Sequence, residues 1–104
     1  MAENYREEIV QRITRNLLDI QLLRLVQAQP IWGYRIKKKV ETDLHITLRH
    51  GALYPTLKSL EQRGFLTSQK QQQGGRARKV YTITKDGKKF LQSYYSILSE
   101  QLKN

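Results

Sequence analysis

The sequence contains no cysteine and no long run of apolar residues. Without cysteine the protein cannot form disulfides, thiolate metal sites or a cysteine nucleophile. A membrane-spanning helix needs roughly 18 consecutive apolar residues, and Asp19, Gln21 and Arg24 interrupt the apolar stretch over residues 17–26. The N-terminus also lacks the basic-then-apolar order of a secretory signal. We therefore expect a cytoplasmic protein with no membrane partner, built as a single domain over residues 1–104.

Acidic residues are scarce in the middle of the chain. The protein has 19 Lys and Arg against 9 Asp and Glu, for a net charge of +10. Residues 1–32 and 90–104 each balance to zero, so residues 33–89 carry all of the +10. Solubility does not require neutral ends around a strongly basic centre. The distribution favours a nucleic acid partner over an anionic membrane surface or an acidic protein.

Apolar periodicity predicts four helices. Two overlapping stripes predict one long N-terminal helix within residues 1–28, which Pro30 ends. A second helix is predicted over residues 33–42, and residues 46–48 then predict a brief strand. The third helix, residues 50–63, is predicted to begin near Gly51 or Ala52, because Pro55 suits a helix start. The last helix is expected to follow Thr84 as N-cap and to occupy residues 85–104.

The third helix is predicted to bury a narrow stripe of Leu53, Leu57 and Leu60. At its C-terminal end, Gly64 suits the left-handed residue that closes a Schellman motif, with Phe65 folding back on Leu60.

Two strands are predicted after the third helix, over residues 65–70 and 78–83. The polar residues 71–77 between them include Gly74-Gly75, which permits a turn. We read this segment as a hairpin with a long, flexible, basic tip.

The order of helix, helix, short strand, helix and hairpin is typical of a winged helix-turn-helix domain. The expected fold is mainly α with a small β-hairpin wing, in which residues 33–84 form the helix-turn-helix and wing and the long terminal helices form a dimer. In this fold the third helix enters the major groove of DNA, and the wing follows the backbone or minor groove. The predicted DNA-binding residues are Tyr34, Lys37, Lys38, His50, Tyr54, Pro55, Lys58, Ser59, Arg76, Arg78 and Lys79. For Arg78, an ion pair with Glu61 beneath the hairpin is the alternative.

Apolar residues of the terminal helices exceed what one small domain can bury. A two-fold partner would cover them and would keep the two basic regions apart. The predicted dimer interface consists of Ile9, Ile13, Leu17, Ile20, Leu91, Tyr94, Tyr95, Leu98 and Leu102.

Several motifs carry a resemblance to a known family. They are Gly33-Tyr34, Gly-Ala-Leu-Tyr-Pro-Thr-Leu at residues 51–57, Leu-Glu-Gln-Arg-Gly-Phe-Leu at 60–66, and the hairpin exit over 75–87. In this order and spacing the chain resembles the PadR family over residues 17 to about 91. It departs from many members at Trp32, where they have His, and at His50, where they have Ser or Thr.

The resemblance implies a dimeric repressor that binds a dyad-symmetric operator and is often released by a small molecule. Some short members stack a flat effector at the dimer interface on a tryptophan that the last helix here lacks. Tyr94 and Tyr95 are the candidates to replace that tryptophan in stacking on an effector. The alternative is that they pack in the dimer, which is more common for aromatic residues at helical spacing.

Other function classes have little support in the sequence. His45 and His50 are the only histidines, and their spacing makes a poor metal site. No phosphate-binding glycine loop follows a strand, and no nucleophile and base pair stands out. We therefore expect no catalysis, no metal and no cofactor. A basic winged helix that binds structured RNA, or that acts in assembly without an operator, is the alternative, and competition between duplex DNA and RNA would discriminate.

Overall fold

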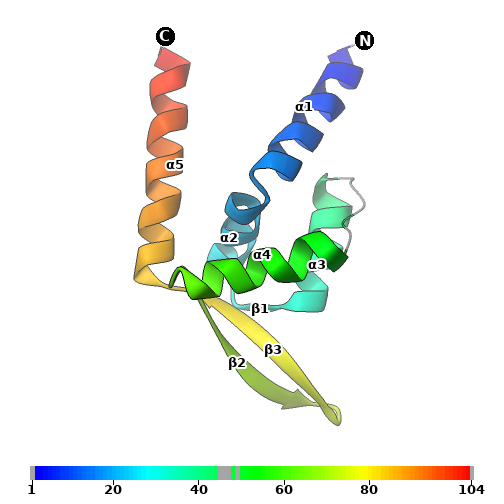
Figure 1. The fold of residues 1–104 in the computed structure, drawn as a ribbon. Helices are drawn as coiled ribbons and strands as arrows, with labels where there is room; N and C mark the ends of the chain where they lie inside the picture. The colour runs from blue at the N-terminus through cyan, green and yellow to red at the C-terminus, as the bar shows by residue number, and fades with distance from the viewer. Residues whose placement is uncertain (1, 45–47, 49, 104) are drawn as a thin grey trace.

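The computed structural model describes residues 2–44, 48 and 50–103. Its helices are α1 (Ala2–Asn16), α2 (Leu18–Ala28), α3 (Gly33–Leu44), α4 (His50–Gln62) and α5 (Lys85–Lys103), and its strands are β1 (Ile31–Trp32), β2 (Leu66–Gln73) and β3 (Arg76–Ile83). The strands form one antiparallel sheet in the order β1-β3-β2. The predicted fold class is confirmed: helices with a β-hairpin wing, which extends from the side opposite to α1, α5 and both termini (Figure 1). No helix of the described segments is long and apolar enough to cross a bilayer.

The N-terminal segment forms two helices, so the prediction of one continuous helix is wrong. The break lies at Leu17, whose φ of −121° and ψ of 40° are not helical. Just before it, the buried Thr14 hydroxyl donates to the Val10 carbonyl over 2.8 Å, a bond that often bends helices. The two apolar stripes explain the bend, because α2 packs into the core while α1 continues beyond it.

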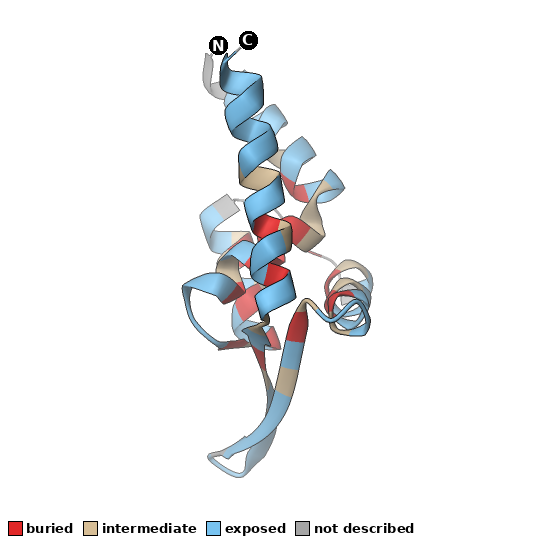
Figure 2. Ribbon diagram, turned by 90° about the vertical axis from the view of Figure 1, so that its left-hand side faces the viewer, coloured by how far each residue is buried: buried red, intermediate tan, exposed pale blue. Residues whose placement is uncertain are grey.

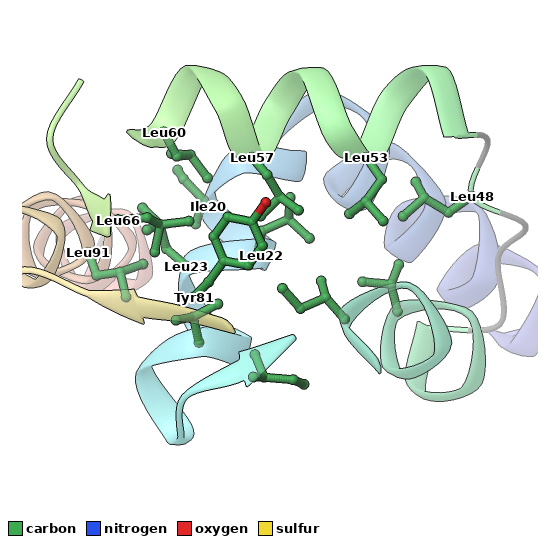
Figure 3. Close-up of a cluster of buried hydrophobic side chains, with 14 residues drawn as sticks. Ile20, Leu22, Leu23, Leu48, Leu53, Leu57, Leu60, Leu66, Tyr81 and Leu91 are labelled. Atoms are coloured by element: carbon green, nitrogen blue, oxygen red, sulfur yellow. The ribbon is translucent and has the colours of Figure 1, made fainter. Parts of the chain in front are cut away.

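The core lies between α2, α3, α4, the sheet and the first turns of α5 (Figure 3). The predicted stripe of Leu53, Leu57 and Leu60 is confirmed, since each of these side chains is at most 1% exposed. They meet Leu22 and Leu23 of α2, which are fully buried. Each such leucine contributes about 1.5–3 kcal/mol through its burial, so α4 is held firmly against the domain by one face.

The sequence predicted the C-terminal end of α4 correctly but placed its start slightly too late. The Schellman closure is confirmed, because Gly64 has φ 79° and the Phe65 N–H donates to the Leu60 carbonyl over 2.9 Å. The helix begins at His50, slightly before the predicted start, so Pro55 lies in its second turn. The proline there removes only the bond to the carbonyl of the exposed Gly51.

The wing is longer and tighter than predicted. Strands β2 and β3 pair without interruption from Leu66↔Ile83 to Gln73↔Arg76, and Gly74 and Gly75 form a two-residue turn with φ of 55° and 79°. Positive φ at both central residues is what a type I′ hairpin turn requires. The prediction of a long loop over residues 71–77 is therefore wrong.

The third strand of the sheet is β1, which the sequence did not predict. Ile31 pairs with Tyr81 and Trp32 with Val80. The strand predicted at residues 46–48 lies largely outside the described residues, and Leu48 itself, although buried, is not part of a strand.

The start of α5 closes the domain. The Gly87 N–H donates to the Thr84 hydroxyl over 3.0 Å, which confirms Thr84 as the N-cap. The Thr84 N–H in turn donates to the Phe65 carbonyl over 3.0 Å. Gly87 is buried against this same carbonyl, so the first turn of α5 touches the backbone between α4 and β2.

Candidate nucleic-acid interface

A groove lies between α4 and the wing, and its volume is about 650 Å³. We call it the wing groove. Its lining consists of Trp32, Gly33, Tyr34, Tyr54, Lys58, Glu61, Arg76, Ala77, Arg78, Lys79 and Tyr81. Four of these residues are basic and one is acidic, so the groove combines positive charge with aromatic walls.

The single acid of the wing groove is held by two partners. Lys79 Nζ lies 3.1 Å from Glu61 Oε1, and the Ser68 hydroxyl donates to Glu61 Oε2 over 2.7 Å. Burial by itself would raise the pKa of Glu61, but the Ser68 hydrogen bond and the Lys79 ammonium outweigh it, and the pKa falls below its ordinary value. The hydrogen bond to Glu61 likewise raises the pKa of Lys79.

This ion pair corrects one sequence-based alternative. Glu61 pairs with Lys79 and not with Arg78. The buried Tyr81 lies beside the pair, and burial raises the pKa of its hydroxyl. Lys79 therefore anchors the base of the wing to α4 and offsets the negative charge of Glu61.

Arg78 stacks on an aromatic ring. Its guanidinium carbon lies 4.0 Å from the centre of the Trp32 ring, and Trp32 lies 5.3 Å from Tyr34, centre to centre. On the next turn of α3, Lys38 Nζ lies 5.5 Å from the centre of the Tyr34 ring. The two rings thus connect a cation of the wing to a cation of α3.

Sequence reasoning missed the part that Trp32 plays. The signal was present in the register, because Trp32 pairs with Val80 and Arg78 lies two residues away on the same face of β3. Diagonal neighbours across strands are within reach of long side chains. The contact was therefore predictable only once residues 31–32 were recognised as a strand.

The structure brings together part of the predicted DNA-binding set. Six of these residues line the wing groove: Tyr34, Tyr54, Lys58, Arg76, Arg78 and Lys79. Pro55 and Ser59 line a separate hollow, which they share with residues of α1 and α2. Lys38 lies beside the groove against Tyr34, and Lys37 is half-buried on α3. The side chain of His50 lies outside the described residues.

Two local contacts tie α3 to α4 and to the segment that precedes α4. A Cβ added to the buried Gly33 would lie 3.2 Å from Tyr54 Cε1, so the missing side chain lets the Tyr54 ring approach the start of α3. At the other end of α3, Glu41 Oε2 accepts a hydrogen bond from the Leu48 N–H over 3.1 Å. These contacts fix the helix-turn-helix and leave the outer side of α4 exposed.

The predicted dimer interface is exposed only in part. Ile9 and Ile13 of α1 and Leu98 and Leu102 of α5 are exposed, whereas Leu17, Tyr94 and Tyr95 are half-buried.

Ile20 and Leu91 are buried in the core of the protomer, so assigning them to an exposed face was wrong. Periodicity identifies an apolar face but not what it packs against. Figure 2 shows that α5 contains buried residues near its N-terminal end, next to the core, and is exposed toward its C-terminal end. Tyr5 and Ile97, which were not predicted, extend the exposed apolar surface.

Among the described residues, no three His, Asp or Glu side chains lie close enough to hold a metal ion. His45 lies outside the described residues.

Comparison with known proteins points to one family. The profile of the transcriptional regulator PadR-like family matches residues 22–93. A PadR family transcription regulator from Clostridium difficile R20291 has 29% identity and a TM-score of 0.74, over 82% of this chain and 90% of that chain. A PadR family transcriptional regulator from Eggerthella lenta has 25% identity and a TM-score of 0.73, over 98% and 92%. Bacillus subtilis PadR, solved in complex with operator DNA, has 30% identity and a TM-score of 0.71, over 76% of this chain and 46% of that chain. No curated protein matches the sequence.

Proposed function

Because the chain belongs to the PadR-like family of transcriptional regulators, we propose that it is a homodimeric repressor that binds an inverted-repeat operator in double-stranded DNA. The observation that carries this proposal is the wing groove. Lys58 on α4 and Arg76 and Arg78 on the wing line one concave surface, on the side of the domain away from α1 and α5. Lys79 offsets the only acid there.

The shape of this surface suits duplex DNA. The major groove is wide enough for one α-helix, and α4 has one face in the core and the opposite face exposed. With α4 in the major groove, the wing would reach the adjacent backbone, where arginines bind phosphates through paired N–H groups. Bacillus subtilis PadR, a protein similar to this chain, was solved in complex with operator DNA, which supports duplex DNA as the partner.

The dimer is proposed from the apolar side chains that one protomer leaves exposed. Those of α1 and α5 lie on helices that leave the domain on the same side, opposite the wing (Figure 1). Two-fold packing of these helices would bury them and keep the two basic regions apart. The two α4 helices would then meet successive major grooves roughly 34 Å apart, which requires an inverted repeat.

Selection of bound sequences from a random duplex pool, followed by fluorescence anisotropy at several salt concentrations, tests the proposal. With roughly four to eight phosphate contacts per dimer, the slope of log affinity against log salt should be about −4 to −7. Lys58→Ala and Ser59→Ala should change the preferred sequence, whereas Arg76→Ala should weaken binding to all duplexes alike.

A flat salt dependence, or the opposite division between helix and wing variants, would contradict this function. Structured RNA serves as the competitor. If it displaces the selected duplex at equal concentration, the protein is an RNA-binding module instead.

A further inference from the structure

We propose that Trp32 is a positioning residue for DNA binding, because its indole holds the guanidinium of Arg78 in the orientation in which it meets a backbone phosphate in the wing groove. The inference rests on the proposed function and assigns a role to the one tryptophan of the chain.

The geometry fixes both partners. Trp32 is half-buried on β1 and is tied to β3 through its pairing with Val80. Its neighbour Ile31 is buried in the core, which leaves the strand little freedom. The guanidinium carbon of Arg78 lies 4.0 Å above the ring, well within the 6 Å or so over which cations are attracted to aromatic faces.

A guanidinium can stack and bind phosphate at the same time. Its planar face contacts a ring, while its edge presents N–H donors to an anion. The stack orders the long side chain before DNA arrives, so less conformational freedom is lost on binding. A lysine at this position would keep the charge but would lose the planar stack.

The other basic residues of the wing do not contact Trp32. Lys70 is exposed on β2, Arg76 is exposed next to the turn, and Lys79 is engaged with Glu61. Arg78 alone of the four is stacked on a ring that belongs to β1, at the junction between the wing and the start of α3. Trp32 therefore sets the position of a wing cation relative to the helix-turn-helix.

A double-mutant cycle tests this role on a selected duplex. Trp32→Leu should weaken binding about fivefold per protomer, or roughly 25-fold per dimer, and Arg78→Gln should weaken it more, because it also removes the phosphate contact. The double variant should bind no more weakly than Arg78→Gln alone, because Trp32 acts through Arg78. Arg78→Gln should also make the salt slope shallower by about two per dimer, whereas Trp32→Leu leaves the slope unchanged.

Arg76→Ala provides the matched control, because Arg76 lies on the same strand. The effects of Trp32→Leu and Arg76→Ala should add. A merely structural tryptophan would weaken binding equally whether Arg78 is present or replaced, and that result would overturn the inference.

A second variant keeps the test valid if Trp32→Leu does not fold. Arg78→Lys should weaken binding about fivefold per protomer at an unchanged salt slope, and wild-type affinity in this variant would overturn the inference. Failure of the proposed function looks different, because the wild-type protein would then show no salt-dependent binding to any duplex.

Discussion

Among the glycines of the described residues, Gly87 is the one at which an added methyl group should lower the stability of the fold most. It lies in the first turn of α5, buried against the backbone that joins α4 to β2. An added Cβ would lie 2.7 Å from Ile83 Cγ1 and 3.2 Å from the Phe65 carbonyl carbon, and closer still to the Phe65 carbonyl oxygen. That oxygen accepts the Thr84 N–H over 3.0 Å, so it cannot move without breaking the N-cap region.

Two effects of Gly87→Ala oppose each other. Alanine favours the helix over glycine by about 1 kcal/mol, whereas forcing a methyl group into a packed site costs about 1–3 kcal/mol and sometimes more. Because the neighbour is backbone rather than a flexible side chain, we expect the upper end of that range. The net loss is about 2 kcal/mol, which lowers the melting temperature by roughly 10 °C in a domain of this size.

Gly51→Ala is the matched control. Gly51 is exposed in the first turn of α4, and an added Cβ would meet no atom within 4 Å. This variant should gain about 0.5–1 kcal/mol from helix propensity. Thermal unfolding followed by circular dichroism, at one protomer concentration for all proteins, compares them. If Gly87→Ala melted at or above the wild-type temperature, the close packing of α5 on Phe65 would be refuted.

The remaining predictions concern the dimer face, the Glu61 pair and the wing. Ile13→Asp or Leu98→Asp places a charge on the exposed apolar surface and should give monomers in sedimentation at micromolar concentration; a variant that stays dimeric would place the interface elsewhere. The folded-state pKa of Glu61 is lowered from its ordinary 4.5, so its stabilisation is present above that pH and is lost as pH falls through the folded value. The melting temperature of the wild type should therefore fall more steeply below about pH 4.5 than that of Glu61→Gln, and parallel curves would contradict the ion pair. Arg76→Ala should make the salt slope of DNA binding shallower by about two per dimer. Lys79→Ala should change it less, because Glu61 already takes up its charge; equal changes would contradict this assignment.

Features encoded by neighbouring residues were predictable from the sequence. The buried stripe of α4, the closure at Gly64 and the cap at Thr84 each depend on residues within one or two turns of one another. Periodicity and capping chemistry describe such local relations directly. The basic character of the central segment was likewise visible in the composition, and it marks the surface that the wing groove presents.

Features that depend on distant pairing were not predictable. A strand as short as β1 has no periodicity of its own, and it exists because β3 pairs with it. The partner of Glu61 could not be predicted for the same reason. Lys79 lies on the same face of β3 as Tyr81, which pairs with Ser68 of β2. Arg78 lies on the other face with Val80, which pairs with Trp32 of β1. Alternation along β3 separates these two residues, but which face meets α4 is decided only by the register.

The wing extends beyond the part of the protein that holds the fold, and it carries basic residues that we propose contact DNA. Strand β1 pairs with Val80 and Tyr81. Within the described part of the chain, the hairpin beyond them is a ribbon with no third strand and with mostly exposed side chains (Figure 2). The hydrogen bonds between the two strands of such a ribbon break at a small cost in free energy, so its backbone amides should exchange with solvent far faster than those near Leu66. Substitutions near the tip should therefore leave the unfolding free energy almost unchanged, so the wing sequence can change the strength of the proposed DNA contacts while the core stays the same.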